Sequence, residues 1–368
     1  MPKAQETVLE ISMSALEHNY RYLRSKVANQ VKFMAVVKAS AYGSDVVSVA
    51  RRLTELGADF LAVAYTSEGV QLRKAGIDTP IMVFHPQSTR YQDLIEYSLE
   101  PNLYSAYNLQ AFLDSARDQK LQDYPVHLKM NTGMNRLGFS YSELDSVIKT
   151  LVENRELKAS SVFSHLAASE DWREREFTLQ QIHLFHKMGI KLLEGLPYRP
   201  LLHICNTSGI INYPEAALDM VRSGIGLQGY GNDEVEDKKL KPIGTLKSII
   251  SQIHHLEAGA SVGYNRAYTS EKPIKSATLP IGYADGIGRK YGNKRAGVFI
   301  NGSYAPIIGN VCMDMMMVDV TGIDCQEGDE VIIIGDLQPA SSLAKQGETI
   351  SYEVITRIAS RVRRVIVK

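Results

Sequence analysis

Lys38 ends a run of buried-type residues, 33–37, and a segment containing Ser and Gly, 39–43, follows it. A run of this length is typical of a strand in a parallel sheet that is covered on both faces. An ammonium group there is costly unless it is paired or loses its proton, and a lysine with a lowered pKa is a good amine for a Schiff base. The alternative is a lysine that ends a strand and points into solvent.

Three more polar residues stand at or just past the ends of predicted strands: Lys129, His165 and Asn206. In a parallel barrel the carboxyl ends of the strands share one rim, where the active site lies. The four positions together therefore favour an active site. A Gly-containing segment, 220–226, could offer backbone N–H groups to a phosphate, although a plain tight turn is an equally good interpretation of it.

Strand-like and helix-like stretches alternate through the first two thirds of the chain. The predicted helix after Lys38 carries apolar residues at helical spacing from Val46 to Leu53, and Gly57 provides a stop. This number of repeated βα units favours a (β/α)8 barrel over an open sheet. The strands expected are 33–37, 60–64, 81–84, 126–130, 161–164 and 201–205.

The pattern changes beyond about residue 230. A charged stretch, 232–239, is typical of a linker, and short β-rich runs with Gly-containing turns follow it. We therefore predict an α/β protein in which an N-terminal (β/α)8 barrel, residues 1–235, precedes a mostly β C-terminal domain, residues 236–368. We expect a strand at about 6–12 to pack with the second domain, which ends in a helix near 352–360 and a strand at 362–367.

Composition excludes several classes of partner. Lys and Arg number 41, as do Asp and Glu, which argues against nucleic acid or an anionic membrane as the main partner. The 3 cysteines lack metal or disulfide spacing, so we expect no metal site and a reducing, cytoplasmic setting. Residues 1–7 contain no apolar segment typical of a signal peptide, and no later segment has the apolar length of a membrane span.

The motifs around these residues resemble those of alanine racemases, pyridoxal-phosphate enzymes built from a barrel and a β domain. The resemblance runs through the whole chain in the order of the family, which makes it highly specific. The matching segments are 36–43, 127–138, 164–167, 206–208, 220–225, 262–264, 280–286, 309–314 and 350–354.

The resemblance implies two acid/base residues, because racemisation removes a proton from one face of the α-carbon and returns it to the other. Lys38 would hold pyridoxal 5'-phosphate and serve one face, and Tyr264 would serve the opposite face. Lowering the pKa of a tyrosine from about 10 toward neutrality requires about 4 kcal/mol of preferential phenolate stabilisation. His165 would supply much of it, through hydrogen bonds that continue to Arg222 and His203. A buried histidine of purely structural role is the alternative for His203.

The family pattern also implies the cofactor contacts. Arg222 would face the pyridine nitrogen and, because it stays protonated, would keep that nitrogen unprotonated and the ring a weaker electron sink. Arg136 would lie beside the phenolic oxygen of the cofactor and the substrate carboxylate. Hydroxyl and amide groups would bind the phosphate. The remaining residues of the implied cofactor site are Tyr42, Asn206, Thr207, Gly224, Ile225 and Tyr352.

Lys129 matches a lysine that is often carbamylated, and the resulting anion would anchor Arg136. An ordinary exposed or salt-bridged lysine is the alternative. The resemblance also implies a homodimer with two shared sites. In this arrangement the β domain of the partner would contribute three residues near the substrate: Tyr283, Met313 and Asp314.

The match departs from the family at Asn131, where Asp is usual and where the change alters the charge near Lys129, and at Thr207 and Asn310. None of these changes removes a catalytic group. The resemblance implies interconversion of L- and D-alanine to supply peptidoglycan. The alternatives are a racemase for serine or a broader set of amino acids, a decarboxylase that shares the fold, and a non-catalytic pyridoxal-phosphate carrier, which would lack the β domain.

Overall fold

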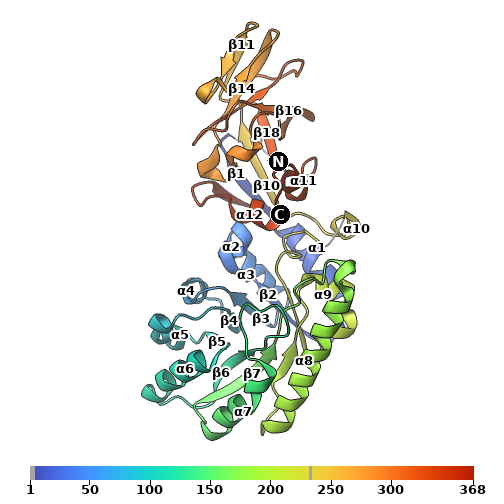
Figure 1. The fold of residues 1–368 in the computed structure, drawn as a ribbon. Coiled ribbons are helices and arrows are strands. Elements are labelled where there is room, and N and C mark those ends of the chain that lie inside the picture. Colours follow the sequence, from blue (N-terminus) through green and yellow to red (C-terminus); the bar gives the residue numbers. More distant parts are fainter. Residues whose placement is uncertain (1–4, 232–233) are drawn as a thin grey trace.

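Eight parallel strands in the N-terminal part form a barrel (Figure 1). In this computed structural model, residues 5–231 and 234–368 are described. The strand order is β8-β7-β6-β5-β4-β3-β2-β9, and two backbone hydrogen bonds close the barrel, from Asp219 N to Leu202 O and from Arg222 N to Cys205 O, both 3.0 Å long. The strands are β2 (Lys32–Val36), β3 (Phe60–Val63), β4 (Ile81–Val83), β5 (Glu100–Leu103), β6 (Tyr124–Lys129), β7 (Leu157–Phe163), β8 (Leu201–His203) and β9 (Met220–Ser223).

Helices cover the outside of the barrel, and side-chain caps begin several of them. Ser12 Oγ accepts from Ala15 N at 3.1 Å in α1, and Asp45 Oδ1 accepts from Ser48 N at 2.8 Å in α3. The apolar residues predicted at helical spacing lie buried on α3. The helices are α1 (Met13–Arg24), α3 (Val46–Glu55), α4 (Thr66–Lys74), α5 (Tyr91–Glu96), α6 (Ala106–Asp118), α7 (Leu144–Glu153), α8 (Arg175–Gly195) and α9 (Thr207–Asn212).

Two barrel strands are absent from the list expected from sequence. β5 reads Glu-Pro-Asn-Leu, with no apolar run, because Glu100 and Asn102 alternate onto the polar interior of the barrel. β9 contains Arg222 and lies in the segment that the sequence presents as a Gly-containing turn. Both strands are short and carry buried polar residues, which removes the hydrophobic signal on which strand prediction depends.

A nine-stranded sheet forms the C-terminal unit, above the barrel in Figure 1, in the order β11-β14-β17-β16-β15-β18-β10-β1-β19. Its first strand in the sequence, β1, pairs antiparallel with β10 and parallel with β19. The strands are β1 (Val8–Ser12), β10 (Gly244–Ile249), β11 (Gln252–Leu256), β14 (Ile274–Leu279), β15 (Gly297–Ile300), β16 (Ser303–Ile308), β17 (Met316–Asp319), β18 (Glu330–Ile334) and β19 (Arg363–Val367).

Smaller elements complete this unit. A two-stranded sheet of β12 (Ser261–Val262) and β13 (Tyr268–Thr269) falls between β11 and β14 in the sequence. Two helices, α11 (Ala340–Gln346) and α12 (Ser351–Thr356), precede β19. The predicted domain boundary at 235/236 falls inside α10 (Glu234–Asp237), while residues 1–4 and 232–233 lie outside the described residues. The fold class predicted from sequence, a (β/α)8 barrel followed by a mostly β domain, is confirmed.

One hydrophobic core runs through both units. Residues of the barrel strands and of the C-terminal sheet belong to a single cluster of buried side chains. The cluster includes Val36 on β2 of the barrel and Leu246 on β10 of the C-terminal sheet, so the two units share packing rather than only a linker. Within the described part of the chain, no helix is both long and apolar enough to cross a bilayer, and all three cysteines are free.

Candidate active site

Lys38 begins a left-handed turn rather than an ordinary loop. β2 ends at Val36, and the four residues 39–42 all have φ between 51° and 59° in the segment α2 (Lys38–Gly43). Each non-glycine residue in this conformation costs roughly 1–2 kcal/mol, so surrounding contacts must hold the turn in place. Glu68 on α4 accepts from Ala39 N at 2.6 Å, and Arg364 Nη2 donates to Gly43 O at 2.8 Å.

The turn opens onto two adjoining pockets at the carboxyl rim of the barrel. Lys38, Phe84, Arg136, His165 and Arg222 belong to the walls of both. One pocket extends toward Asn102, Lys129 and Phe163, and the other toward the loop after β9 and Tyr352 of the C-terminal unit. The residues predicted from sequence that line these pockets are Lys38, Tyr42, Lys129, Arg136, His165, Asn206, Thr207, Arg222, Gly224, Ile225 and Tyr352.

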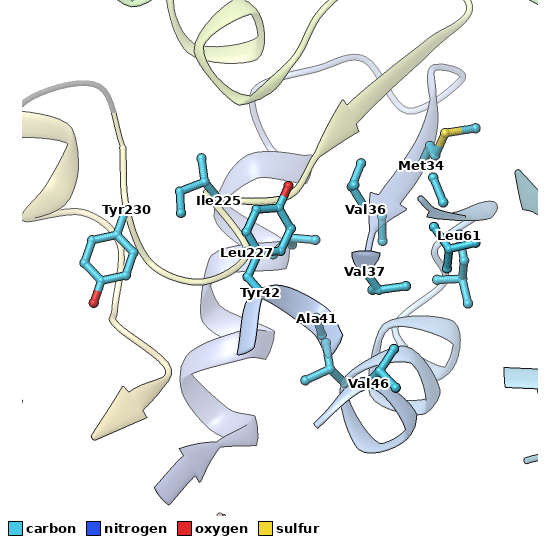
Figure 2. Packing of buried hydrophobic residues seen from close by; sticks show 14 of the residues in the cluster. Met34, Val36, Val37, Ala41, Tyr42, Val46, Leu61, Ile225, Leu227 and Tyr230 are labelled. Carbon is cyan, nitrogen blue, oxygen red and sulfur yellow. The ribbon is translucent and has the colours of Figure 1, made fainter. Parts of the chain in front are cut away.

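The second pocket presents a cradle of hydroxyl and amide donors. Gly224 and Ile225 line it, and among the described residues no protein acceptor pairs with their backbone N–H groups. Burial raises the pKa of Tyr42, and it raises the pKa of Tyr352 to about 12, so both phenols remain proton donors at neutral pH. Figure 2 shows the Tyr42 ring beside the loop that carries Ile225. The donor set fits a phosphate group.

Gly224 makes room for the Tyr42 hydroxyl. A Cβ atom added at Gly224 would lie 2.0 Å from Tyr42 Oη. We predict that Gly224→Ala weakens binding of pyridoxal phosphate, the cofactor that the sequence resemblance implies, by about tenfold or more, because overpacking of this kind costs about 1–3 kcal/mol. A titration followed by cofactor absorbance measures the effect. Gly288→Ala, whose added Cβ would meet only Lys290 Cγ at 3.8 Å, should bind as the unaltered protein does, and equal affinities for the two variants would contradict the prediction.

Arg222 is buried and has five hydrogen-bond acceptors, none of them a carboxylate. Nη1 donates to His203 Nδ1 at 2.7 Å, and Nη2 donates to Ser164 O at 2.7 Å and to His165 Nδ1 at 3.4 Å. The other two acceptors are the carbonyl groups of His203 and Ile204. Burial lowers the pKa of Arg222 to about 10, so the side chain stays positively charged at neutral pH.

Burial and positive neighbours favour the uncharged forms of the groups around Arg222. The pKa values of His165 and His203 are held well below the usual range, mainly by burial and next by the charge of Arg222. Both rings are therefore neutral at pH 7. Burial, followed by Arg136, lowers the pKa of Lys38. The pKa of Lys129 is held well below its ordinary value, mainly by burial and next by the positive charges of Arg222 and Arg136. The pockets therefore favour neutral, nucleophilic amines.

Asn206 takes a structural role at the rim. Its Oδ1 accepts from Gly209 N at 2.8 Å, which caps α9, and from Ser169 Oγ at 2.9 Å, while Nδ2 donates to Leu166 O at 3.4 Å. Thr207, the first residue of that helix, places Oγ1 2.9 Å from Ser223 Oγ. Asn206 therefore lines the pocket and also orients the segment that carries Thr207.

Four residues predicted to approach the substrate lie outside these pockets in the single chain: Tyr264, Tyr283, Met313 and Asp314. Tyr264 is 72% exposed, Met313 is 53% exposed and Tyr283 is 43% exposed. Asp314 forms an ion pair with Arg361 at 2.7 Å. Because all four belong to the C-terminal unit and none lines either pocket, one chain alone does not bring them to Lys38.

Several residues in or next to the pockets were missed by the sequence reasoning. Phe163 lies under Lys129, whose Nζ is 4.6 Å from the ring centroid, and it stacks on His203 at 5.1 Å. Glu68 holds the turn after Lys38, also accepting from Ala64 N at 2.7 Å. Asn102 could have been found from its alternation with Glu100 along β5. Glu68 lies in the first turn of α4, where an acidic residue is ordinary, so its contact with the turn after Lys38 gives no sequence signal.

The fold and the pockets define a class of protein: a parallel barrel joined to a β domain, with a lysine and a phosphate-type cradle at the carboxyl rim. The family model for the alanine racemase N-terminal domain matches residues 11–232, and the model for the C-terminal domain matches residues 243–366. The chain belongs to the alanine racemase family, and it is therefore an enzyme of the isomerase class.

The relatives cover nearly the whole chain. The alanine racemase of Thermodesulfovibrio yellowstonii is 36% identical over 363 residues, which is 96% of each chain. Alanine racemase 1 of Clostridium acetobutylicum is 37% identical over 370 residues, 98% of this chain and 95% of the relative.

Solved structures agree with the observed fold. The alanine racemase of Clostridium difficile 630 has a TM-score of 0.93 at 32% identity, covering 100% of this chain and 97% of its own. The Bartonella henselae enzyme, solved with covalently bound pyridoxal phosphate, has a TM-score of 0.89 at 29% identity, covering 99% of this chain and 100% of its own.

Proposed function

We propose that this chain racemises alanine with pyridoxal 5'-phosphate as its cofactor. The observation that carries the proposal is the pocket that unites Lys38, Arg222 and the donor cradle at Gly224 and Ile225. Relatives named alanine racemase at 36% and 37% identity support alanine as the substrate. The unpaired backbone N–H groups of the cradle and the partly desolvated amine of Lys38 together fit the cofactor.

In this proposal each part of the cofactor has a matching group. Lys38 would bind its aldehyde carbon, and Arg222 would donate to its ring nitrogen, while Arg136 would bind the phenolic oxygen and the substrate carboxylate. The phosphate would bind the cradle residues: Tyr42, Thr207, Gly224, Ile225 and Tyr352. Asn206 would help by orienting α9. Pyridoxal phosphate supplies an aldehyde that binds the substrate amine and a ring that withdraws electrons from the α-carbon.

The protein's own task is then to move one proton between two faces. In the proposed mechanism Lys38 Nζ holds or releases the proton on one face of the α-carbon, and Tyr264 Oη does so on the other. His165 would stabilise the phenolate by donating a hydrogen bond from Nε2, because its neutral ring accepts from Arg222 at Nδ1. Tyr264 is 72% exposed in the single chain, which supports delivery of this residue to the site of a second subunit.

We therefore propose a homodimer with shared sites. Each barrel would receive Tyr264, Tyr283, Met313 and Asp314 from the C-terminal unit of its partner. The exposure of three of these side chains, and their absence from both rim pockets, support this arrangement. A surface patch of this kind, rich in exposed Tyr and Met, has the composition of an interface core.

Lys129 is a candidate for carbamylation. It is buried, and in the described part of the chain its only recorded partner is the Phe163 ring. A neutral amine can attack carbon dioxide, forming a C–N bond and releasing one proton, and the product is an anion. We propose that this carbamate pairs with Arg136, which lines the same pocket.

The cellular setting is also a proposal. D-alanine formed by this reaction would supply peptidoglycan, and free thiols at all three cysteines suit a reducing cytoplasm. A racemase of serine or of broader specificity remains the alternative activity, because no residue described here excludes a hydroxymethyl side chain. A non-catalytic pyridoxal-phosphate carrier is disfavoured, because residues 243–366 match the family's C-terminal domain.

We expect purified protein to convert L-alanine to D-alanine and to convert L-serine more slowly. Borohydride should fix the cofactor irreversibly to a peptide that contains Lys38, because a partly desolvated amine is the one suited to bind the aldehyde. Chiral chromatography measures turnover, and peptide mapping locates the label. Label on another lysine, or turnover of serine alone, would refute the corresponding part of the proposal.

A further inference from the structure

A buried chain of polar side chains leads away from Arg222 through the interior of the barrel. Beyond the 2.7 Å contact between Arg222 and His203 Nδ1, His203 Nε2 lies 2.8 Å from Ser161 Oγ, and Ser161 Oγ lies 2.6 Å from His127 Nδ1. His127 Nε2 lies 2.9 Å from Glu100 Oε2. Both histidines and Ser161 are fully buried, with no exposed surface.

The last contact is short but not aligned as a linear hydrogen bond. Glu100 Oε2 and His127 Nε2 have no hydrogen-bond partner elsewhere in the described part of the chain, although they lie within ion-pair distance of each other. A buried polar atom without a hydrogen bond carries a desolvation cost. A small rotation of either side chain would align these two atoms in a hydrogen bond and remove that cost. We therefore treat Glu100 as the end of the chain of contacts.

The donor and the acceptor of each hydrogen bond between Arg222 and His127 can be assigned in turn, starting from Arg222. A guanidinium group has no acceptor, so His203 Nδ1 must accept from Arg222, and the neutral ring must carry its proton on Nε2. His203 Nε2 then donates to Ser161, whose hydroxyl proton is free to donate to His127 Nδ1. His127 Nδ1, as the acceptor of that hydrogen bond, carries no proton, so the ring proton lies on Nε2, which faces the carboxylate of Glu100.

The strand register makes this chain of contacts possible. Glu100 begins β5, at the end of the barrel opposite the carboxyl rim, and His127 on β6 lies opposite Ser161 on β7. Residues two apart on one strand share a face, so His127 and Lys129 on β6 point into the same interior. Arg73 and Tyr124 are the other titratable groups that interact electrostatically with Glu100.

We propose that Ser161, His127 and Glu100 are positioning residues that hold His203 in the tautomer able to accept from Arg222. The proposal rests on the proposed function, in which Arg222 binds the ring nitrogen of the cofactor. Arg222 has no carboxylate among its own partners, and this chain of contacts connects it to one. If His203 carried its proton on Nδ1 instead, two N–H groups would face each other and Arg222 would shift.

The tautomers can be measured without assaying activity. In the holoenzyme labelled with 15N-histidine, we expect His127 and His203 both to show a protonated Nε2 and an unprotonated Nδ1 at neutral pH. The variants His127→Gln and His203→Gln assign the signals, and neutron diffraction from crystals of the unaltered holoenzyme locates the same protons without a substitution. A proton on Nδ1 of either ring would overturn the proposal.

Substitutions test whether the chain acts on Arg222. Ser161→Ala removes the central hydroxyl, and we expect kcat to fall about tenfold, the usual consequence of a lost buried hydrogen bond, with KM for alanine within about threefold. The matched control is Ser248→Ala, a buried serine of the C-terminal sheet whose hydroxyl lies 2.8 Å from Thr7 Oγ1. Equal kcat values for the two variants would overturn the proposal.

Glu100 is tested by a pair of variants. Glu100→Gln keeps an acceptor oxygen and should preserve the His127 tautomer, whereas Glu100→Leu removes it and should alter the NMR signals of both histidines. An unchanged His127 signal in Glu100→Leu would count against the proposal. If the unaltered protein fails to racemise any amino acid, the proposed function fails, but the tautomer measurement still decides whether the chain of contacts exists.

Discussion

Tyr264→Phe should lower racemisation of alanine by about a thousandfold, because loss of one of two acid/base groups typically costs between about 10²- and 10⁴-fold. Cofactor binding should change little, since Tyr264 is 72% exposed and belongs to neither rim pocket of its own chain. The loss should also be asymmetric. Exchange of the α-hydrogen of L-alanine with solvent deuterium should suffer more than that of D-alanine, because in the proposed division of roles Lys38 serves the D-side and Tyr264 the L-side.

The matched control for this experiment is Tyr304→Phe. Tyr304 is an exposed tyrosine of the same unit, 44% exposed on β16, and it belongs to neither rim pocket, so its loss of a hydroxyl should leave both exchange rates unchanged. Proton NMR of each enantiomer in deuterated buffer measures the two rates separately. Equal residual exchange for L- and D-alanine in Tyr264→Phe would contradict the assignment of one residue to each face.

A mixture of two inactive variants should regain activity. If Lys38 of one chain works with Tyr264 of the other, a heterodimer of a Lys38→Ala chain and a Tyr264→Phe chain has one site with both residues and one site with neither. Random reassociation of equal amounts makes half of the dimers mixed, so activity should recover to roughly a quarter of the unaltered enzyme (1/2 × 1/2). Racemase activity is measured before and after dissociation and reassociation.

Subunit exchange has to be demonstrated independently. Chains carrying different affinity tags should be purified over both resins in turn, which isolates the mixed dimer, and each variant reassociated with itself serves as the control. The isolated mixed dimer should reach about half of the unaltered activity, since one of its two sites is complete. Negligible activity in a verified mixed dimer would show that both residues act within one chain.

Much of the fold was predictable from hydrophobic pattern. Runs such as 33–37 and 60–64 are apolar throughout because parallel strands are covered on both faces, and the helix at Val46 to Leu53 carries its apolar residues at helical spacing. The pattern failed at β5 and β9, because polar residues on the barrel interior replace the apolar ones there. The fold class nevertheless followed from the number of units that remained.

For the candidate site, the sequence predicted which residues take part but not the backbone conformation that holds them. The residues that line the rim pockets stand at strand ends or in specific motifs, so Lys38, Lys129, His165 and Arg222 could be named from sequence. The left-handed turn at residues 39–42 could not, because these residue types usually avoid that conformation and tertiary contacts, among them those with Glu68 and Arg364, hold it in place.

The sequence by itself determined the family, the order of the units and the residues able to react with a cofactor, because these depend on local motifs and on periodicity. Tertiary structure alone decided which distant residues meet. Glu100, His127 and Ser161 give no joint signal along the chain, and the strand register places them in one buried row. Tyr264 lies in a segment that resembles a motif of the family, yet its absence from the rim pockets that Lys38 lines is a property of how the two units pack. Contacts between residues far apart in sequence follow from strand pairing and domain packing, which local pattern does not encode.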